Sequence, residues 1–353
     1  MGFPPTSLVT GCSGFIGAHV AQELIRIGHR VIGIDDLSGG FVENHPEGLD
    51  FHLGSVTDSD TVTRLFKTYR PDYVFHLAAY AAEGLSHFIK RFNYTNNLLG
   101  SVNLINAAVN ADTVKCFVFT SSIAVYGANQ VPMQEEMVPQ PEDPYGIAKF
   151  AVELDLRETR EMFGLNYVIF RPHNVYGEYQ NIGDRYRNVI GIFMNQVMQG
   201  KSMTIFGDGL QTRAFSYVSD VAPIIARSVE RTESYNRVFN VGADKPYTVL
   251  ELASVVARAF GVEARVVHMP PRNEVVHAFS SHERVRAVFG DLLANVPLDV
   301  GVARMAEWAR RVGPRQSRSF GNVEVSRNLP PSWRDVLRGE DGHQSVAVDN
   351  GSK

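Results

Sequence analysis

The turn Val9-Thr10-Gly11-Cys12-Ser13-Gly14-Phe15-Ile16-Gly17 places three glycines between a short apolar run and an amphipathic segment. The run at residues 7–10 is predicted to form a strand and residues 15–27 a helix. Glycines between a strand and a helix allow a tight turn, and they let backbone N–H groups approach a pyrophosphate at the helix N-terminus. The sequence therefore predicts a dinucleotide site at this turn, with contacts from Gly11, Gly14, Phe15, Ile16 and Gly17.

An acidic pair follows the second expected strand, residues 30–34. Asp35 lies 18 residues beyond Gly17, and Asp36 and Ser38 come directly after it. A carboxylate at this place accepts hydrogen bonds from an adenosine ribose and repels the additional phosphate of NADP. The predicted cofactor is therefore NAD. The alternative interpretation is a glycine-rich turn before a solvated acidic loop.

Short apolar runs alternate with amphipathic stretches through the first half of the chain, a pattern typical of βαβ units. The predicted fold class is α/β, a Rossmann-type doubly wound parallel sheet with a smaller mixed α/β substrate-binding domain. At 353 residues the chain exceeds what one core usually supports, so two domains are expected. Their boundaries are predicted at 1–172 and 215–246 for the cofactor domain and at 173–214 and 247–335 for the substrate domain, with a disordered tail at 336–353.

Composition excludes several classes of function. With a net charge of −4, the chain has no basic field for gathering nucleic acid or anionic lipid. Two cysteines are too few for a disulfide framework or a metal cluster. No signal peptide and no apolar run long enough to cross a bilayer are found. We therefore expect a soluble cytoplasmic protein with no nucleic-acid or membrane partner and no metal.

A tyrosine and a lysine stand at positions i and i+4 of an expected helix, residues 145–163. Tyr145 has an ordinary pKa of about 10, too high for a base at neutral pH. The Lys149 ammonium and a positive nicotinamide ring are expected to lower that pKa. Ser122 follows the expected strand at residues 115–120 at its carboxyl end, where open α/β sheets bind ligands. A substrate hydroxyl shared by Ser122 and Tyr145 is the predicted centre. The alternative for the pair alone is an exposed tyrosine near a solvated lysine.

Together these motifs resemble the extended short-chain dehydrogenase/reductase superfamily, and within it the NAD-dependent UDP-sugar 4-epimerases of the UDP-galactose 4-epimerase type. The resemblance covers about residues 7 to 310. It implies that Tyr145 deprotonates the 4-hydroxyl of a hexose, that Ser122 steadies the developing carbonyl and that Lys149 holds the nicotinamide ribose. It also implies a homodimer through the helices at 96–110 and 145–163. Further cofactor contacts implied by the resemblance are Ser55, Val56, Leu77, Ala78, Ala79 and Asn97.

Departures from the family pattern narrow the reaction. Dehydratases and decarboxylases of this superfamily carry acidic residues where this chain has Ile123 and Ala124. These two side chains do not exchange protons, so elimination across the ring loses its usual route. Epimerisation is favoured, with a non-catalytic NAD-binding protein as a third hypothesis that the retained catalytic set disfavours. Ser55 stands where many relatives have an aspartate near the adenine, and Ala81 stands where a lysine or glutamine is common.

The substrate site is expected from the middle of the chain onward. The stretch at 202–207 resembles the family's uridine-binding strand, which implies that Phe206 stacks on a uracil base. The resemblance also implies that Arg213 and Arg272 clamp the diphosphate through bidentate bonds and that Glu274 binds the uridine ribose. The full expected substrate set is Ser122, Tyr145, Asn174, Arg185, Arg187, Asn188, Val189, Thr204, Phe206, Arg213, Arg272 and Glu274.

The identity of the sugar rests on two cations. Arg185 and Arg187 precede Asn188, and a carboxylate at carbon 6 would pair with them, which favours UDP-glucuronate. The alternative is that these arginines line the loop or bind phosphate, which leaves UDP-glucose. Ala278 falls near a position where a bulky residue restricts the family's pocket, so UDP-N-acetylglucosamine is also open. The loop resembles that of the glucuronate 4-epimerases of antibiotic pathways.

Overall fold

The computed structural model describes residues 3–128, 131–271, 277–316, 320–321, 323–330 and 333. Its main sheet has seven strands in the order β11-β6-β5-β4-β1-β2-β3, and every neighbouring pair is parallel. The order reverses at β1, and the carboxyl ends of β1 and β4 border the crevice where such sheets bind ligands. The strands are β1 (Thr6–Thr10), β2 (Arg30–Asp35), β3 (Asp50–Leu53), β4 (Tyr73–His76), β5 (Cys116–Thr120), β6 (Tyr167–Pro172) and β11 (Arg237–Val241).

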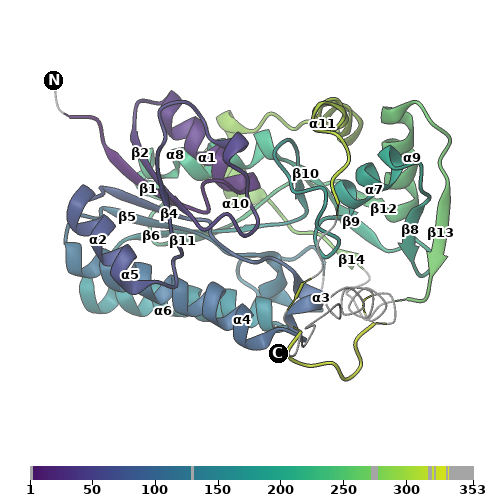
Figure 1. Ribbon diagram of the computed structural model, residues 1–353. Coiled ribbons are helices and arrows are strands. Elements are labelled where there is room, and N and C mark those ends of the chain that lie inside the picture. Colours follow the sequence, from purple (N-terminus) through teal and green to yellow (C-terminus); the bar gives the residue numbers. More distant parts are fainter. Residues whose placement is uncertain are drawn as a thin grey trace, which may run out of the picture.

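Helices cover both faces of this sheet, which confirms the predicted doubly wound α/β class (Figure 1). On one face α1, α8 and α10 share an apolar core with the strands, and on the other α2, α5 and α6 do so. Buried strands of this kind read as continuous apolar runs, as β5 and β6 do. The helices are α1 (Phe15–Arg26), α2 (Ser59–Tyr69), α3 (Glu83–Ser86), α4 (Lys90–Tyr94), α5 (Gly100–Ala111), α6 (Pro144–Phe163), α8 (Ala222–Arg227) and α10 (Glu283–Phe289).

A second apolar core lies beyond the carboxyl ends of the strands, at the right of Figure 1. Helices α7 (Val189–Met198), α9 (Val249–Phe260) and α11 (Leu298–Val312) enclose it. Its small sheets pair β8 with β13 and order β12-β9-β14, and β7 pairs with β10 between the two cores. These strands are β7 (Val175–Tyr176), β8 (Met203–Phe206), β9 (Thr212–Ala214), β10 (Ser216–Tyr217), β12 (Pro246–Thr248), β13 (Val266–Met269) and β14 (His277–Ala278).

Some elements differ from the expectations. The sequence analysis does not predict strands β3 and β11. The helix expected at 96–110 begins with a π-helical stretch, η2 (Thr95–Leu99), before α5. Helix α10 packs through Val285 and Phe289 into the core of the main sheet, although the expected boundaries place this segment in the substrate domain. The remaining short helices are η1 (Val42–Asn44), η3 (Ile123–Tyr126), η4 (Val218–Asp220), η5 (Ser228–Glu230), η6 (Thr232–Ser234) and η7 (Gly290–Leu292).

The described residues contain neither a membrane-spanning helix nor a cluster of metal ligands. None of the described helices is long and apolar enough to cross a bilayer. In the same part of the chain, no three His, Cys, Asp or Glu side chains lie together as ligands for a metal ion.

Candidate active site

A cavity of about 1360 Å³ runs along the carboxyl ends of β1, β2, β4 and β5 and continues between the two cores. Sites for single drug-sized ligands occupy about 300–1,000 Å³, so this one has room for more than one such molecule. Several buried polar atoms on its wall have no hydrogen-bond partner among the described residues, a state that a bound ligand relieves. These wall atoms are Thr120 Oγ1, Gln180 Oε1, Arg185 Nε and Arg187 Nε.

The glycine turn is built so closely that side chains do not fit. Gly11 has φ +71°, and a Cβ there would lie 2.8 Å from the backbone N of Ala78. A Cβ on Gly17 would lie 2.0 Å from the carbonyl oxygen of Gly11, so helix α1 packs directly on the turn. Gly14 is the N-cap of α1 and faces the cavity with its neighbours. A pyrophosphate fits this cradle because the helix N-terminus offers it unpaired N–H groups.

Asp35 ends β2 at the edge of the same cradle. Its carboxylate accepts hydrogen bonds from the backbone N–H groups of Ser13, at 3.0 Å, and Leu37, at 2.8 Å. Burial raises the pKa of Asp35, and these two bonds offset part of that rise. A carboxylate has about four acceptor sites, so two N–H bonds leave room for ribose hydroxyls. The geometry fits the adenosine half of NAD.

The three expected catalytic residues meet at the opposite end of this wall. Ser122 follows β5 and is the N-cap of η3, where its hydroxyl accepts from the N–H of Ala124 at 3.1 Å. Tyr145 and Lys149 lie one turn apart near the start of α6, and Lys149 Nζ is 5.8 Å from the centre of the Tyr145 ring. All three side chains are almost fully buried and line the cavity. The predicted grouping is present.

Electrostatics at this centre differ from the expectation. Burial raises the pKa of Tyr145 above that of a free tyrosine, the Glu83 carboxylate raises it further, and a hydrogen bond with Ser122 offsets only part. Burial also lowers the pKa of Lys149 to about 7. The Lys149 ammonium donates to the carbonyl oxygen of Thr120 at 2.8 Å. Lowering of the Tyr145 pKa by Lys149 is thus not seen in the protein alone, because burial dominates both groups.

A buried ion pair lies directly beneath the catalytic residues. Glu153, one turn beyond Lys149 on α6, accepts two bonds from Arg171 of β6, at 2.9 Å to Nε and 2.5 Å to Nη2. It also accepts from the hydroxyl of Ser121 at 2.6 Å, and Arg171 donates to the Tyr126 hydroxyl at 2.7 Å. Arg171 is 1% exposed and Glu153 0%. The pair therefore ties α6 to β6 and to the loop that carries the catalytic serine.

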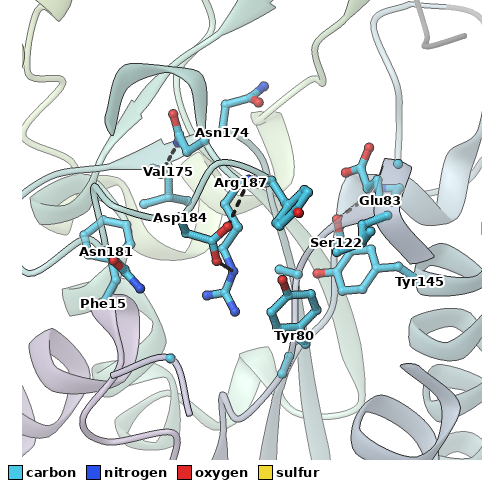
Figure 2. A pocket seen from close by; sticks show the side chains of 18 of the residues that line it. Phe15, Tyr80, Glu83, Ser122, Tyr145, Asn174, Val175, Asn181, Asp184 and Arg187 are labelled. Carbon is cyan, nitrogen blue, oxygen red and sulfur yellow. Dashed lines mark hydrogen bonds and ion pairs between the residues drawn. The ribbon is translucent and has the colours of Figure 1, made fainter. Parts of the chain in front are cut away.

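Arg187 occupies the middle of the cavity, as Figure 2 shows. Its Nε lies 3.0 Å from a carboxylate oxygen of Asp184, close enough for an ion pair although its N–H does not form a hydrogen bond. The guanidinium also lies 4.6 Å from the centre of the Tyr80 ring. Its positive charge lowers the pKa of Tyr145 slightly, which places it within electrostatic reach of the catalytic centre. Arg185 lines the cavity as well.

Other expected substrate residues line the far part of the cavity. Phe206 ends β8, and Arg213 lies on β9 beside it in the substrate unit. Asn188 caps α7 and donates to the carbonyl of Val175 at 2.6 Å. The expected residues found on the cavity wall are Gly11, Gly14, Phe15, Ile16, Gly17, Asp35, Asp36, Ser38, Ser55, Val56, Leu77, Ala78, Ala79, Ser122, Tyr145, Lys149, Asn174, Arg185, Arg187, Asn188, Val189, Thr204, Phe206 and Arg213.

One expected residue of the described part of the chain is not on that wall, and two others fall outside that part. Asn97 is buried behind it, where its amide accepts from the N–H of Tyr80 at 2.9 Å and donates to the Tyr80 carbonyl at 3.1 Å. It therefore holds the loop after β4 instead of facing the cofactor site directly. Arg272 and Glu274 lie outside the described residues.

Sequence reasoning missed Glu83. This residue opens α3, lines the cavity and raises the pKa of Tyr145 through its charge. Ile123 and Ala124 also line the cavity, so Glu83 supplies a carboxylate where the residues beside Ser122 supply none. The signal available in the sequence was its place in the loop that follows β4, since that loop leaves the sheet at the ligand-binding edge.

Comparisons with known proteins agree with this site. The NAD dependent epimerase/dehydratase family matches residues 7–242. A UDP-glucose 4-epimerase of Mycolicibacterium smegmatis is 33% identical over 311 residues, which cover 86% of this chain and 98% of that protein.

Two solved structures extend the comparison. A UDP-glucose 4-epimerase of Thermotoga maritima with UDP-glucose is 34% identical, with a TM-score of 0.83, and the match covers 87% of this chain and 99% of that one. A UDP-glucuronic acid 4-epimerase of Bacillus cereus, in complex with UDP-glucuronic acid and NAD, is 25% identical, with a TM-score of 0.79 and the same coverage. NAD is thus the cofactor typical of these relatives, and their substrates are UDP-sugars.

Proposed function

We propose that this chain, a member of the NAD dependent epimerase/dehydratase family and an NAD-dependent UDP-sugar 4-epimerase, prefers UDP-glucuronate as its substrate. The product of this reaction is UDP-galacturonate. The observation that carries the proposal is the place of Arg187 in the cavity, within electrostatic reach of Tyr145. A guanidinium within electrostatic reach of the catalytic tyrosine suits a carboxylate at carbon 6 of the hexose. The relative that binds UDP-glucuronic acid with NAD supports this substrate class.

In this proposal each of the three catalytic residues has a separate role. Tyr145 removes the proton from the 4-hydroxyl, and the Ser122 hydroxyl holds the same oxygen as it becomes a carbonyl. Lys149, fixed to the Thr120 carbonyl at 2.8 Å, orients the ribose at the nicotinamide end. Bound NAD supplies the acceptor for the hydride from carbon 4, and the NADH so formed supplies the donor that returns it to the opposite face of the keto-sugar. The keto-sugar then turns its other face, and Tyr145 returns the proton.

Burial of Tyr145 explains why proton abstraction from the sugar requires bound NAD. A phenol with a raised pKa stays protonated at neutral pH and cannot accept a proton, so Tyr145 is inactive until positive charge arrives beside it. The cationic nicotinamide ring supplies such a charge. The absence of an acid or base at Ile123 and Ala124 favours epimerisation over elimination.

UDP-glucose is the second candidate, and Glu83 is the observation that favours it. A carboxylate on the wall near Tyr145 repels a second carboxylate and accepts a hydrogen bond from a neutral 6-hydroxyl. Asp184 also neutralises part of the Arg187 charge, since the two lie 3.0 Å apart.

The test compares substrates directly. Purified protein without added NAD is incubated with UDP-glucuronate, UDP-glucose or UDP-N-acetylglucosamine, and the products are read by proton NMR. We expect the 4-epimer of UDP-glucuronate to form fastest. Arg187→Met should lower kcat/KM for UDP-glucuronate by ten- to about a hundredfold, which corresponds to a lost charged hydrogen bond, and should spare UDP-glucose. Release of carbon dioxide or water instead of a 4-epimer contradicts the proposal.

Tyr145→Phe is the matched mechanistic variant. It should abolish turnover while NAD remains bound, because the phenol oxygen is lost and the cradle at Gly11 and Gly17 is unchanged. Full activity in this variant contradicts the assigned role of Tyr145.

We also propose a homodimer through the helical stretch at 96–110, formed by η2 and α5, and through α6. Leu99, Ile147 and Leu154 are 51%, 42% and 45% exposed on these elements, so apolar surface remains uncovered there in the single chain. Light scattering of the purified protein should give a molar mass twice the 39.2 kDa of one chain.

A further inference from the structure

The chain continues after α11 and returns to the catalytic side of the main sheet. We call residues 320–333 the C-terminal strap, of which the structure describes 320–321, 323–330 and 333. Figure 1 shows this yellow end of the chain beside α3 and α4, far from α11 in space. Both of these helices belong to the loop region between β4 and α5, directly before the catalytic wall.

An apolar cluster holds the strap in place. Leu329 and Trp333 are 2% and 6% exposed and share this cluster with Ala82, Leu85 and Ile89. The Phe320 ring also packs on the ring of Phe92 with 4.8 Å between centroids, in a T-shaped arrangement. Burial of large apolar side chains stabilises the contact, so the described part of the strap is docked on α3 and α4.

Hydrogen bonds fix its register. The Glu324 carboxylate accepts from the backbone N–H groups of Arg91, at 2.7 Å, and Phe92, at 2.8 Å. The N–H groups of Glu324 and Val325 both donate to the carbonyl of Phe88, at 2.8 and 3.1 Å. These bonds pair the strap with one stretch of backbone in one position.

Trp333 is the point at which the strap reaches the active site. It lines the cavity, and its ring lies 5.1 Å from the ring of Tyr186, the neighbour of Arg187. On the other side its ring lies 6.0 Å from that of Phe88. A Cβ on Gly84, the residue after Glu83, would lie 3.7 Å from the indole. Trp333 thus joins the substrate loop to α3 across the sugar end of the cavity.

We propose that Trp333 is a specificity-determining residue that closes the cavity over the hexose of a nucleotide sugar. The inference rests on the proposed function and extends it to a part of the chain that the glycine turn and the catalytic set do not include. The part of the indole that reaches the cavity is apolar, which suits the C–H groups of a pyranose and excludes water. A keto-sugar that must turn over in the site needs such a wall, because its escape ends the cycle before hydride returns.

The first test reads binding, not activity. In Tyr145→Phe protein, UDP-glucose and UDP-glucuronate are titrated while tryptophan emission is followed, with UDP as the ligand that lacks a sugar. We expect the two UDP-sugars to change the emission and UDP to leave it almost unchanged. The chain has two tryptophans, and Trp308 lies in the core of the substrate unit. Adding Trp333→Phe should therefore remove the response.

The second test separates KM from kcat. Trp333→Ala should raise KM for the preferred UDP-sugar about tenfold with a smaller change in kcat, because an aromatic contact with bound substrate is lost. Released keto-sugar should appear in solution with this variant and not with the parent. A chain ending at Gln316 should behave similarly. Val325→Ala, whose side chain is 40% exposed, and a chain ending at Asp335 are the controls that should match the parent.

Two results overturn the assignment of Trp333. One is an emission response to UDP-sugars that persists in the Trp333→Phe protein, and the other is an unchanged KM in Trp333→Ala without released keto-sugar. Both are distinct from failure of the proposed function, in which the complete chain converts no UDP-sugar at all.

Discussion

Replacement of Glu153 by glutamine removes the charge that balances the buried Arg171. Glu153 is 0% exposed and accepts from two guanidinium nitrogens and from the Ser121 hydroxyl, at 2.5 to 2.9 Å. Breaking a buried pair by removing one partner costs about 3–5 kcal/mol, because the other charge stays buried. A folded domain is stable by about 5–15 kcal/mol in total, so this loss is a large share.

Denaturant unfolding followed by circular dichroism measures the effect. We expect Glu153→Gln to lower the free energy of unfolding by about 3–5 kcal/mol. The double variant Glu153→Gln with Arg171→Met should recover much of it, since the unpaired Arg171 charge is removed as well. Glu158→Gln, at an exposed position on the same helix, should stay within about 0.5 kcal/mol of the parent. A Glu153→Gln protein as stable as the Glu158→Gln control refutes the reasoning.

Further predictions concern single ionisable groups. Glu83→Gln should move the acidic limb of the kcat/KM profile to lower pH, because the Glu83 charge raises the pKa of Tyr145; an unmoved limb counts against that coupling. Burial, with His282 beside it, lowers the pKa of His173 to about 3, so the unfolded chain binds a proton below about pH 6.5 that the folded protein refuses. His173 alone should lower the free energy of unfolding by about 1.4 kcal/mol per pH unit as pH drops from about 6.5 to 3, so the slope in His173→Gln should be shallower than in the parent by that amount; an equal slope counts against this role of His173. Asp35→Ala should weaken NAD binding about tenfold in equilibrium dialysis and improve NADP binding; equal NAD affinity contradicts the ribose contact.

The cofactor half of the site was predictable because its signals are local. Gly11 and Gly17 stand in a turn that excludes any Cβ, and Asp35 ends the adjacent strand. Tyr145 and Lys149 lie one helical turn apart, so their proximity follows from spacing alone. These residues meet because parallel strands bring their carboxyl ends to one edge.

Residues brought together by tertiary packing were not predictable in the same way. Glu83 and Trp333 are 250 residues apart in the sequence, and both line one cavity because the strap packs on α3. Glu153 and Arg171 lie in a helix and a strand whose sequences show no unusual pattern. No local sequence signal predicts that these two side chains form a buried ion pair. Strand β3, Asp50–Leu53, has a mixed polar and apolar sequence that is only partly buried. It lies at the edge of the sheet and pairs with β2 alone, so its sequence carries no apolar run that predicts a strand.

One isotope measurement tests the proposed epimerisation most directly. The purified protein is given UDP-glucuronate that carries deuterium at carbon 4, without added NAD, and the product is analysed by NMR and mass spectrometry. If hydride leaves and returns within the closed cavity, UDP-galacturonate forms and keeps its deuterium at carbon 4. UDP-galacturonate that has lost the deuterium to solvent would contradict that mechanism. So would a product formed from the substrate by loss of carbon dioxide or water.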